Sequence, residues 1–336
     1  MNYEIMEENM NNEISQQDRN KALLIANNIL NYYKTKVVGQ PGLGYSILLS
    51  MITNGHILLE SVPGLAKTTA ARVVTESIGG DFSRIQCTPD LLPGDIIGTQ
   101  IYNMNNNTFE NKFGPVFANF VLLDEINRSS AKTQSAMLEA MQERTVSIGG
   151  TTFKLPDVFV VIATQNPIEQ EGTYVLSEAQ LDRFLLKEVI TYPNTEDEME
   201  ILNRVEANVF ASNEQVASIE DIVFLQELTK KVFVSAQVKK YIVDIVQATR
   251  RADEILPTEL RGYVEMGAST RAAIALMEIS KAVALLSGRN YVIPDDVKAF
   301  RYNILRHRIS LNFSAVADNV SVEQIIDGII GAVIVP

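Results

Sequence analysis

Residues 61–68 combine a lysine and a threonine with a loop that leads into a helix, a pattern that can bind phosphate. The apolar segment HILLE (56–60) runs directly into SVPGLAKT, and the helical pattern TAARVVTESI follows. Backbone N–H groups and the helix dipole can cradle phosphate oxygens, with Lys67 on the β- and γ-phosphates and Thr68 on Mg²⁺. The nucleotide contacts expected here are Val62, Pro63, Gly64, Leu65, Ala66, Lys67, Thr68 and Thr69.

This loop departs from the strict pattern GxxxxGK[ST], because Ser61 and Ala66 stand at its two glycine positions. Ala66 keeps its N–H, although its methyl group narrows the space near the phosphates. A turn with a solvated lysine is the alternative. That alternative does not explain why an apolar strand leads into Lys-Thr without a polar spacer.

A pair of adjacent carboxylates ends the apolar segment VLLDE (121–125). In α/β proteins the carboxyl ends of strands are where ligands bind. Asp124 would hold Mg²⁺ through water, and Glu125 would orient and deprotonate the attacking water. The alternative is a pair of acids stabilised by the dipole at the start of a helix.

A polar end also closes the apolar segment FVVIATQNP (159–167). Asn166 is expected beside the strand that carries Asp124, where a neutral amide can bind the γ-phosphate or the lytic water without repelling it. An asparagine in a turn before proline is the alternative, and such turns are common.

Two arginines could reach phosphate. Arg183, in QLDRF (180–184), is a candidate arginine finger for a neighbouring subunit, with a surface pair with Asp182 as the alternative. Arg271 opens a long helix that Ser269 or Thr270 can cap. A cation at a helix N-terminus is unfavourable unless an anion offsets it, so a phosphate-sensing role is favoured.

The elements that must position these residues follow from the apolar pattern. Five short apolar segments at 56–60, 82–87, 120–125, 159–165 and 184–190 alternate with amphipathic stretches, which predicts an α/β fold with a parallel sheet buried on both faces. Residues 145–156 are expected to form a hairpin, and the insertion at about 93–115 a second hairpin or a loop excursion. Residues 1–20 are expected to form a flexible tail, 21–192 an α/β nucleotide-binding core, and 193–336 a small all-α domain.

Composition limits the other possibilities. The 336 residues carry a net charge of −12, which disfavours a polyanion as partner, so no nucleic acid is expected. The single cysteine, Cys87, excludes an intramolecular disulfide and is interpreted as a core thiol. No apolar run reaches the roughly 18–20 residues that span a bilayer, and the acidic N-terminus does not resemble a signal peptide, so no membrane insertion and a cytoplasmic location are expected.

Four longer stretches closely resemble the MoxR family of AAA+ ATPases: ESVPGLAKTT, LLDEINRSSAKTQSAMLEAMQERTVSIGG, ATQNPIEQEGTYVLSEAQLDRFLLK and GASTRAAIAL. The resemblance extends from about residue 37 to the C-terminus. It implies an AAA+ P-loop core, an αβα sandwich with the hairpin at 93–115 inserted in its second helix, followed by a helical lid domain. It also implies that the segment VVGQ lies near the adenine, through Val38, Gly39 and Gln40.

The resemblance also marks departures from the family. In GASTR, which resembles the sensor-2 motif, Thr270 stands where the family usually has proline. Ala66 is common in the family, whereas Ser61 is less usual and is expected to reduce affinity or turnover. Val175 and Ser177 stand where the family often has prolines, which loosens the loop before Arg183.

By the same resemblance, the cofactors are ATP and Mg²⁺ and the assembly is a ring, usually a hexamer, with ATP between protomers. The implied work is chaperone-like remodelling or maturation of partners with von Willebrand factor A domains, a step that rests on analogy. The main hypothesis is therefore an ATP-hydrolysing ring in which Glu125, Asn166, Arg183 and Arg271 act on the nucleotide. A nucleotide-gated scaffold with little hydrolysis and a nucleic-acid motor are the alternatives.

Overall fold

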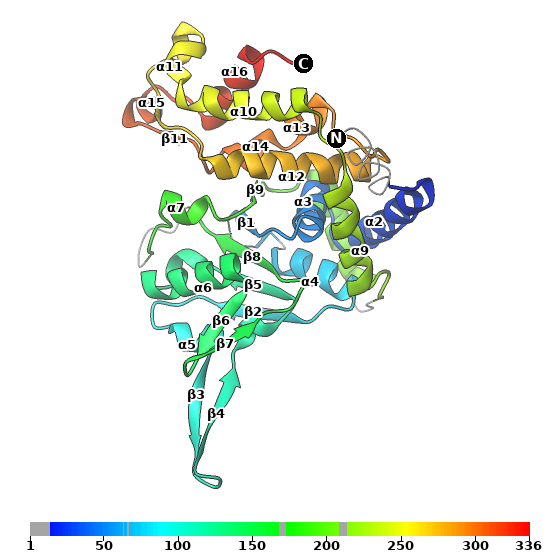
Figure 1. The fold of residues 1–336 in the computed structure, drawn as a ribbon, viewed down its shortest axis with the longest axis vertical. Helices are drawn as coiled ribbons and strands as arrows, with labels where there is room; N and C mark the ends of the chain where they lie inside the picture. Colours follow the sequence, from blue (N-terminus) through cyan, green and yellow to red (C-terminus); the bar gives the residue numbers. More distant parts are fainter. Residues whose placement is uncertain (1–13, 63, 66, 168–172, 208–213) are drawn as a thin grey trace, which may run out of the picture. The chain divides into compact units, whose positions relative to one another are not determined.

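The computed structural model describes residues 14–62, 64–65, 67–167, 173–207 and 214–336. Contacts divide the chain into two units, residues 28–222 and residues up to 27 together with 223–336. The first unit is built around a β-sheet and the second mainly from helices (Figure 1). The division falls within two helices, α2 (Gln16–Lys36) and α9 (Ile219–Lys231).

Five parallel strands in the order β2-β5-β8-β1-β9 organise the sheet unit. Their bounds are β1 Ile57–Glu60, β2 Phe82–Gln86, β5 Phe120–Asp124, β8 Val160–Gln165 and β9 Leu186–Val189. Each strand lies within one of the apolar segments identified in the sequence, so the α/β class with a parallel sheet is confirmed. Since β1 lies beside β8 and not β2, the chain crosses the sheet between strands that are distant in sequence.

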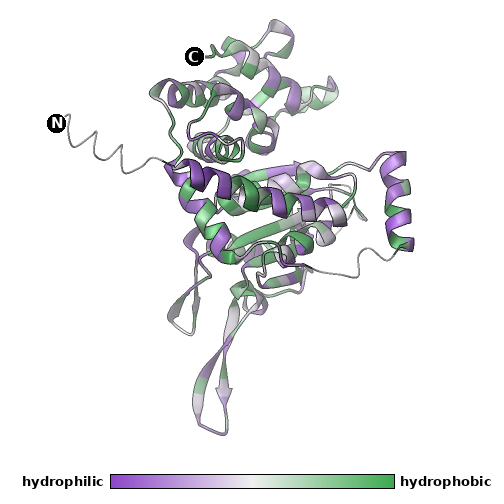
Figure 2. Cartoon of the chain, turned by 90° about the vertical axis from the view of Figure 1, so that its right-hand side faces the viewer, coloured by the Kyte–Doolittle hydropathy of each residue, from purple (hydrophilic) through white to green (hydrophobic). Residues whose placement is uncertain are grey.

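Burial decreases from the centre of this sheet to its edges. Every residue of β5 is buried, as are the first five of β8 and the first three of β1. Figure 2 shows green, hydrophobic segments in the interior of the sheet unit. In the edge strand β2 only Ile85 is buried. The prediction of burial on both faces is thus right for the central strands and wrong for β2, which lacks a neighbouring strand on one side. This edge leaves Arg84 and Gln86 accessible to polar partners.

Helices connect the strands of the sheet unit. Helix α4, which begins at the end of the phosphate loop, contacts β2 and β5, and the helix before β1, α3, contacts β1 and β9. Ser130 caps the helix that follows the acidic pair, because its side chain accepts a hydrogen bond from the Thr133 N–H. The bounds are α3 Pro41–Ile52, α4 Lys67–Ser77, α6 Ala131–Glu143, α7 Glu178–Leu181 and α8 Thr195–Glu206.

The hairpin expected at 145–156 is confirmed, and the insertion at 93–115 also contains a hairpin. β6 (Thr145–Ile148) pairs with β7 (Thr151–Lys154), and β3 (Gly98–Asn103) pairs with β4 (Thr108–Phe113) after the short helix α5 (Pro93–Ile97). The β3–β4 hairpin projects away from the sheet (Figure 1). It exposes several large apolar side chains, namely Ile101, Tyr102, Met104, Phe109 and Phe113.

The helical unit is organised around helix α12 (Thr270–Leu286), which contacts α10, α13 and α14. Leu276, Ile279 and Val283 lie on one stripe of α12 and are buried, and Leu285 is buried more deeply than Leu286. The other elements are α10 Ala236–Arg250, α11 Ala252–Ile255, β10 Val264–Met266, α13 Pro294–Ala299, α14 Arg301–Leu305, β11 Ser310–Leu311, α15 Phe313–Ala317 and α16 Val322–Ala332.

The N-terminal segment of the chain is partly helical. Residues 1–13 of the expected tail lie outside the described residues, whereas its last part is helical from Gln16 onward. Ser15 starts this helix, since its hydroxyl oxygen accepts the Asp18 N–H at 3.0 Å. The contact division lies at residue 222, later than the change in composition at 193, and the domain boundary stays a prediction. Along the described chain no helix is both long and apolar enough to cross a membrane.

A buried histidine joins three elements of the sheet unit. His56 Nδ1 accepts a hydrogen bond from the Val161 N–H of β8 at 3.0 Å, and Nε2 lies 3.0 Å from the carbonyl oxygen of Met141 in α6. Burial, followed by the nearby charge of Arg144, lowers the pKa of His56 to about 3. The neutral ring, with Nε2–H donating to Met141, therefore satisfies both contacts.

We expect His56 to make the free energy of unfolding dependent on pH. The unfolded chain binds a proton at His56 near pH 6.5, whereas the folded chain does so only near pH 3. The contribution of His56 to stability is thus fully present above pH 6.5, and it is lost by about 1.4 kcal/mol per pH unit as the pH falls between these values. Urea unfolding of wild type and His56→Gln across this range measures it. Equal slopes for the two proteins would contradict the expectation.

Candidate functional site

Three central strands bring the chemically interesting residues to one edge of the sheet. Strands β5, β8 and β1 are adjacent and parallel, with Leu123 opposite Ala163 and Glu60 opposite Gln165. The loop after β1, the acidic pair after β5 and the asparagine after β8 therefore all leave the carboxyl edge of the sheet. Ligands of open α/β sheets bind at this edge.

The phosphate loop is anchored to the neighbouring strand. The Ser61 N–H donates to the Gln165 carbonyl oxygen at 3.2 Å, and Lys67 Nζ donates to the Ser61 carbonyl oxygen at 3.3 Å. Ser61 is buried, and its hydroxyl donates to the Val62 carbonyl oxygen at 2.9 Å. The serine at the first glycine position is therefore accommodated by contacts with the backbone.

One glycine of this loop has a conformation that requires glycine. Gly64 has a φ of 86°, and a Cβ atom placed there would meet no heavy atom within 4 Å. The loop thus has open space at Gly64, and Lys67, Thr68 and Thr69 form the first residues of α4 immediately after it. Pro63 and Ala66, also predicted as nucleotide contacts, lie outside the described residues.

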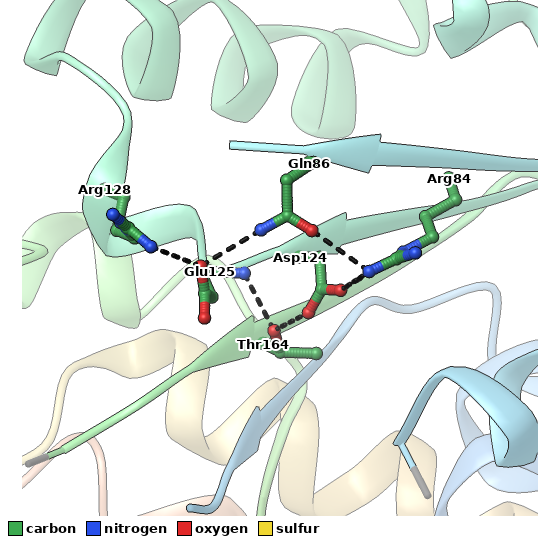
Figure 3. Close-up of polar contacts among 6 residues, drawn as sticks. All are labelled: Arg84, Gln86, Asp124, Glu125, Arg128 and Thr164. Carbon is green, nitrogen blue, oxygen red and sulfur yellow. Dashed lines mark hydrogen bonds and ion pairs between the residues drawn. The ribbon is translucent and has the colours of Figure 1, made fainter. Parts of the chain in front are cut away.

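Asp124 ends strand β5 among hydrogen-bond donors from both neighbouring strands (Figure 3). Arg84 of β2 donates to Asp124 Oδ2 through Nη2 at 2.6 Å and through Nε at 3.2 Å. The Thr164 hydroxyl of β8 donates to Asp124 Oδ1 at 2.8 Å. Each carboxylate oxygen therefore has a partner, as a buried charge requires.

Glu125 leaves the strand with an uncommon backbone conformation. Its φ of 58° lies in the left-handed region, which costs a residue with a Cβ about 1–3 kcal/mol. The Thr164 hydroxyl oxygen accepts the Glu125 N–H at 2.9 Å and so supports this turn. Glu125 Oε2 accepts hydrogen bonds from Gln86 Nε2 at 3.0 Å and Arg128 Nη1 at 3.1 Å (Figure 3). The two carboxylates thus have separate sets of partners.

A cavity of about 460 Å³ lies beside the end of β8. Asn166 is buried at its wall, and so is Asn127, which belongs to the turn after Glu125. The Asn127 side-chain oxygen is buried and has no hydrogen-bond partner within the described residues. The lining residues are Asn127, Gln165, Asn166, Pro167, Thr173, Val175, Leu176 and Leu181.

Arg183 lies between α7 and β9. Its side chain is half-buried, and the buried Nε has no hydrogen-bond partner in the part of the chain that the structure describes. Ser177 starts α7 in a capping box with Gln180, whose side-chain oxygen accepts the Ser177 N–H at 2.8 Å. The loop that was expected to be loosened at this position is therefore organised locally. The role of Arg183 as a finger stays a prediction, because it requires a second subunit.

Arg271 is exposed in the first turn of α12, and the Ser269 hydroxyl oxygen accepts its N–H at 3.0 Å, so Ser269 is the cap of this helix. The phosphate-sensing role of Arg271 stays a prediction, because Arg271 belongs to the helical unit and the phosphate loop to the sheet unit.

The segment expected near the adenine forms the turn between α2 and α3. Val38 is half-buried, and Gly39 has a φ of 73°. Gln40 joins this turn to the end of the sheet, because its Nε2 donates to the Thr191 carbonyl oxygen at 2.9 Å. The adenine contact itself stays a prediction.

The sequence did not assign roles to three residues that contact the acidic pair, namely Arg84, Gln86 and Thr164. Arg84 and Gln86 are two positions apart on β2, so their side chains lie on the same face. That spacing was visible in the sequence, but the lateral order of β2 beside β5 was not. Arg128, in the turn after Glu125, pairs with Glu125 within the chain.

The single cysteine is a core residue, as predicted. Cys87 follows β2, is buried, and donates its backbone N–H to the Asp124 carbonyl oxygen at 2.9 Å. Burial raises the pKa of its thiol to about 12. The thiolate that nucleophilic chemistry needs is therefore disfavoured.

Comparison with known proteins adds independent findings. Residues 56–186 match the "ATPase family associated with various cellular activities (AAA)", and residues 258–329 match the "AAA lid domain". The chain is 46% identical to "Chaperone MoxR1" of Mycobacterium tuberculosis over 90% of this chain and 80% of that protein. It is 45% identical to protein YeaC of Bacillus subtilis over 89% of this chain and 91% of that protein. A solved structure of "a putative ATPase" from Cytophaga hutchinsonii matches with a TM-score of 0.87 and 46% identity, covering 94% of this chain and 97% of that chain.

We expect the Thr164 hydroxyl to stabilise the fold, because it donates a hydrogen bond to the Asp124 carboxylate and accepts one from the Glu125 N–H. Thr164→Val keeps the shape but leaves the Glu125 N–H and one Asp124 oxygen without their partner, which costs about 1–3 kcal/mol. Thr164→Ser keeps the hydroxyl and removes one methyl group, which costs about 0.8 kcal/mol. Urea unfolding at neutral pH gives both values. A valine variant as stable as wild type would show that the hydroxyl does not have this role.

Proposed function

Since this chain belongs to the MoxR family of AAA+ ATPases, we propose that it binds ATP with Mg²⁺ at the carboxyl edge of the sheet and hydrolyses it. The observation that carries this proposal is the convergence of the phosphate loop, Asp124, Glu125 and Asn166 at that edge. The work done with the released energy is remodelling of partner proteins.

Lys67 and the N-terminus of α4 bind the phosphates. Lys67 Nζ already lies over the loop, at 3.3 Å from the Ser61 carbonyl oxygen, so a small movement exchanges this contact for a phosphate oxygen. The N–H groups in the first turn of α4 and its dipole favour the same negative charge. The backbone of Val62, Gly64 and Leu65 forms part of this phosphate-binding loop. The open space at Gly64 leaves room for a phosphate group.

The residues present fit Mg²⁺. Thr68 offers a hydroxyl at the start of α4, Asp124 offers a buried carboxylate, and α4 contacts the strand that ends in Asp124. Mg²⁺ prefers such oxygen ligands, and it typically uses one or two protein groups together with waters and phosphates. When bound, the ion offsets the charge that develops on the phosphate oxygens.

Glu125 takes the proton of the attacking water, and Asn166 holds that water in line. Glu125 becomes available as a base when it leaves Gln86 and Arg128, both of which are within 3.1 Å of its Oε2. Asn166 and Asn127 are lining residues of the neighbouring cavity, and both have side-chain amide groups. A neutral amide can bind water there without repelling phosphate.

Assembly completes the site. Arg183 from one protomer offsets transition-state charge at the site of the next, in a ring that family resemblance indicates to be a hexamer. The side chain of Arg183 is only half-buried, which supports a contact with a neighbouring subunit. Arg271 senses the phosphate, and Val38, Gly39 and Gln40 contact the adenine.

The partner is a protein. The relative named "Chaperone MoxR1" supports chaperone-like work, and family resemblance points to substrates with von Willebrand factor A domains. The projecting β3–β4 hairpin, with its exposed apolar side chains, is the part of the sheet unit best suited to contact such a protein. Because ATP is the proposed substrate, a cytoplasmic location accompanies the proposal.

A nucleotide-gated scaffold with little hydrolysis is the second candidate. The contacts of Asp124 with Arg84 and of Glu125 with Arg128 favour it, since both carboxylates must exchange partners before they can act. ATP turnover distinguishes the two candidates. A scaffold would bind ATP as tightly as an active ATPase, but its slow turnover would be the same with or without Glu125.

A mixing experiment tests hydrolysis and assembly together. Glu125→Gln and Arg183→Ala are each expected to lower ATP turnover by at least about a hundredfold when assayed alone. When the two variants are mixed, an intact Glu125 in one subunit can meet an intact Arg183 from its neighbour, so part of the activity returns. Lys67→Ala mixed with Glu125→Gln is the control, because no intact nucleotide site remains.

Failure of activity to return in the first mixture would contradict a finger acting between subunits, provided that size-exclusion chromatography shows mixed oligomers. Full activity of Glu125→Gln alone would contradict its role as the base and would favour the scaffold.

A further inference from the structure

The contacts of Arg84 single it out within the proposed site. Two of its nitrogens donate to the same oxygen of Asp124, at 2.6 and 3.2 Å, so the forked guanidinium holds this carboxylate in one orientation. Thr164 holds the other oxygen at 2.8 Å (Figure 3). Arg84 is the cationic partner of Asp124.

The two partners differ in their freedom to move. The side chain of Asp124 is 12% exposed at the end of a central strand, whereas that of Arg84 is 47% exposed on the edge strand. Arg84 can therefore swing into water at low cost. Asp124 cannot leave, and without a cation its buried charge is uncompensated. The exchange of partners at Asp124 must take place by movement of Arg84.

Mg²⁺ bound through Asp124 would compete with Arg84 for the same carboxylate. A guanidinium that donates twice to Oδ2 occupies the directions in which that oxygen would accept a metal-bound water. A divalent cation beside it also meets like-charge repulsion. The attraction of each cation for the carboxylate therefore weakens the binding of the other.

We propose that Arg84 is a positioning residue that competes with Mg²⁺ for Asp124, acting as a counter-ion that the metal must displace. This inference rests on the proposed function, because it assumes that Asp124 takes part in binding Mg²⁺ with ATP. Its consequence is that the metal requirement of nucleotide binding is set by Arg84 on β2 as well as by the metal ligands.

Displacement of Arg84 from Asp124 would also affect Glu125, the second carboxylate. Arg84 Nη2 also donates to Gln86 Oε1 at 3.0 Å, and Gln86 Nε2 donates to Glu125 Oε2 at 3.0 Å (Figure 3). When Arg84 leaves Asp124, it withdraws a donor that orients the Gln86 amide. Arg84 thereby links the occupancy of Asp124 to the freedom of Glu125.

The test measures binding without turnover. Binding of the non-hydrolysable analogue AMP-PNP is followed over a series of free Mg²⁺ concentrations for wild type, Arg84→Gln and Arg84→Lys. We expect Arg84→Gln to lower the Mg²⁺ concentration at half-maximal binding by about threefold to tenfold, the effect of losing one partly exposed charged contact. Arg84→Lys keeps the positive charge but loses the forked guanidinium. Its Mg²⁺ concentration at half-maximal binding should therefore lie between those of wild type and Arg84→Gln.

Arg128→Gln is the matched control, because it removes the same charge from the pair with Glu125 instead of the pair with Asp124. It should shift the Mg²⁺ midpoint by less than about twofold. Melting temperatures provide a second readout. Arg84→Gln should melt below wild type without ligand, and Mg²⁺ with AMP-PNP should raise its melting temperature by more than that of wild type.

The possible outcomes distinguish failure of the competition between Arg84 and Mg²⁺ from failure of the proposed ATPase function. An unchanged or higher Mg²⁺ midpoint in Arg84→Gln, or an equal shift in Arg128→Gln, would overturn the competition while leaving the nucleotide site intact. If wild type binds AMP-PNP no better than Lys67→Ala at any Mg²⁺ concentration, the proposed function itself is overturned, and the role of Arg84 with it.

Discussion

A carboxylate at the end of a buried central strand must be compensated, and the arrangement of the whole edge follows from how Asp124 is compensated. The parallel order β2-β5-β8 places Arg84 on one side of Asp124 and Thr164 on the other, so each oxygen receives a donor from a different strand. Thr164 then accepts the N–H of Glu125 and supports the left-handed turn that carries this residue away from the strand. A contact that offsets buried charge thus also fixes the direction of the proposed catalytic base.

We propose that the site exchanges between two arrangements of these contacts. In one arrangement, which the structure describes, arginines hold both carboxylates; in the other, which we propose, Asp124 faces the metal and Glu125 faces water. The exchange requires movement only of Arg84, Gln86 and Arg128, which lie on an edge strand and in a turn, while the buried strands remain in place. Rigid strands with mobile edge residues allow binding of nucleotide to change side-chain partners without loss of the core.

Much of this organisation could be predicted from the sequence, because apolar segments bounded by polar ends identify strands and the residues that leave them. Lys67, Asp124, Glu125 and Asn166 each follow such a segment, and the structure brings their strands to one edge. The partners Arg84 and Gln86 could not be predicted, since they act through the lateral order of strands, which the pattern along one strand does not contain. The start of α2 was missed because Ser15 and Asp18 form a cap within a polar stretch that lacks apolar periodicity. Roles that require another protomer, such as that of Arg183, depend on contacts outside a single chain.

The most direct measurement is ATP turnover per protomer as a function of protein concentration, with Lys67→Ala as the blank. We predict that turnover per protomer rises with concentration to a plateau, because the site is completed by a neighbouring subunit, and that Lys67→Ala shows no turnover at any concentration. Wild-type turnover no higher than that of Lys67→Ala across the whole range would contradict ATP hydrolysis at this edge of the sheet.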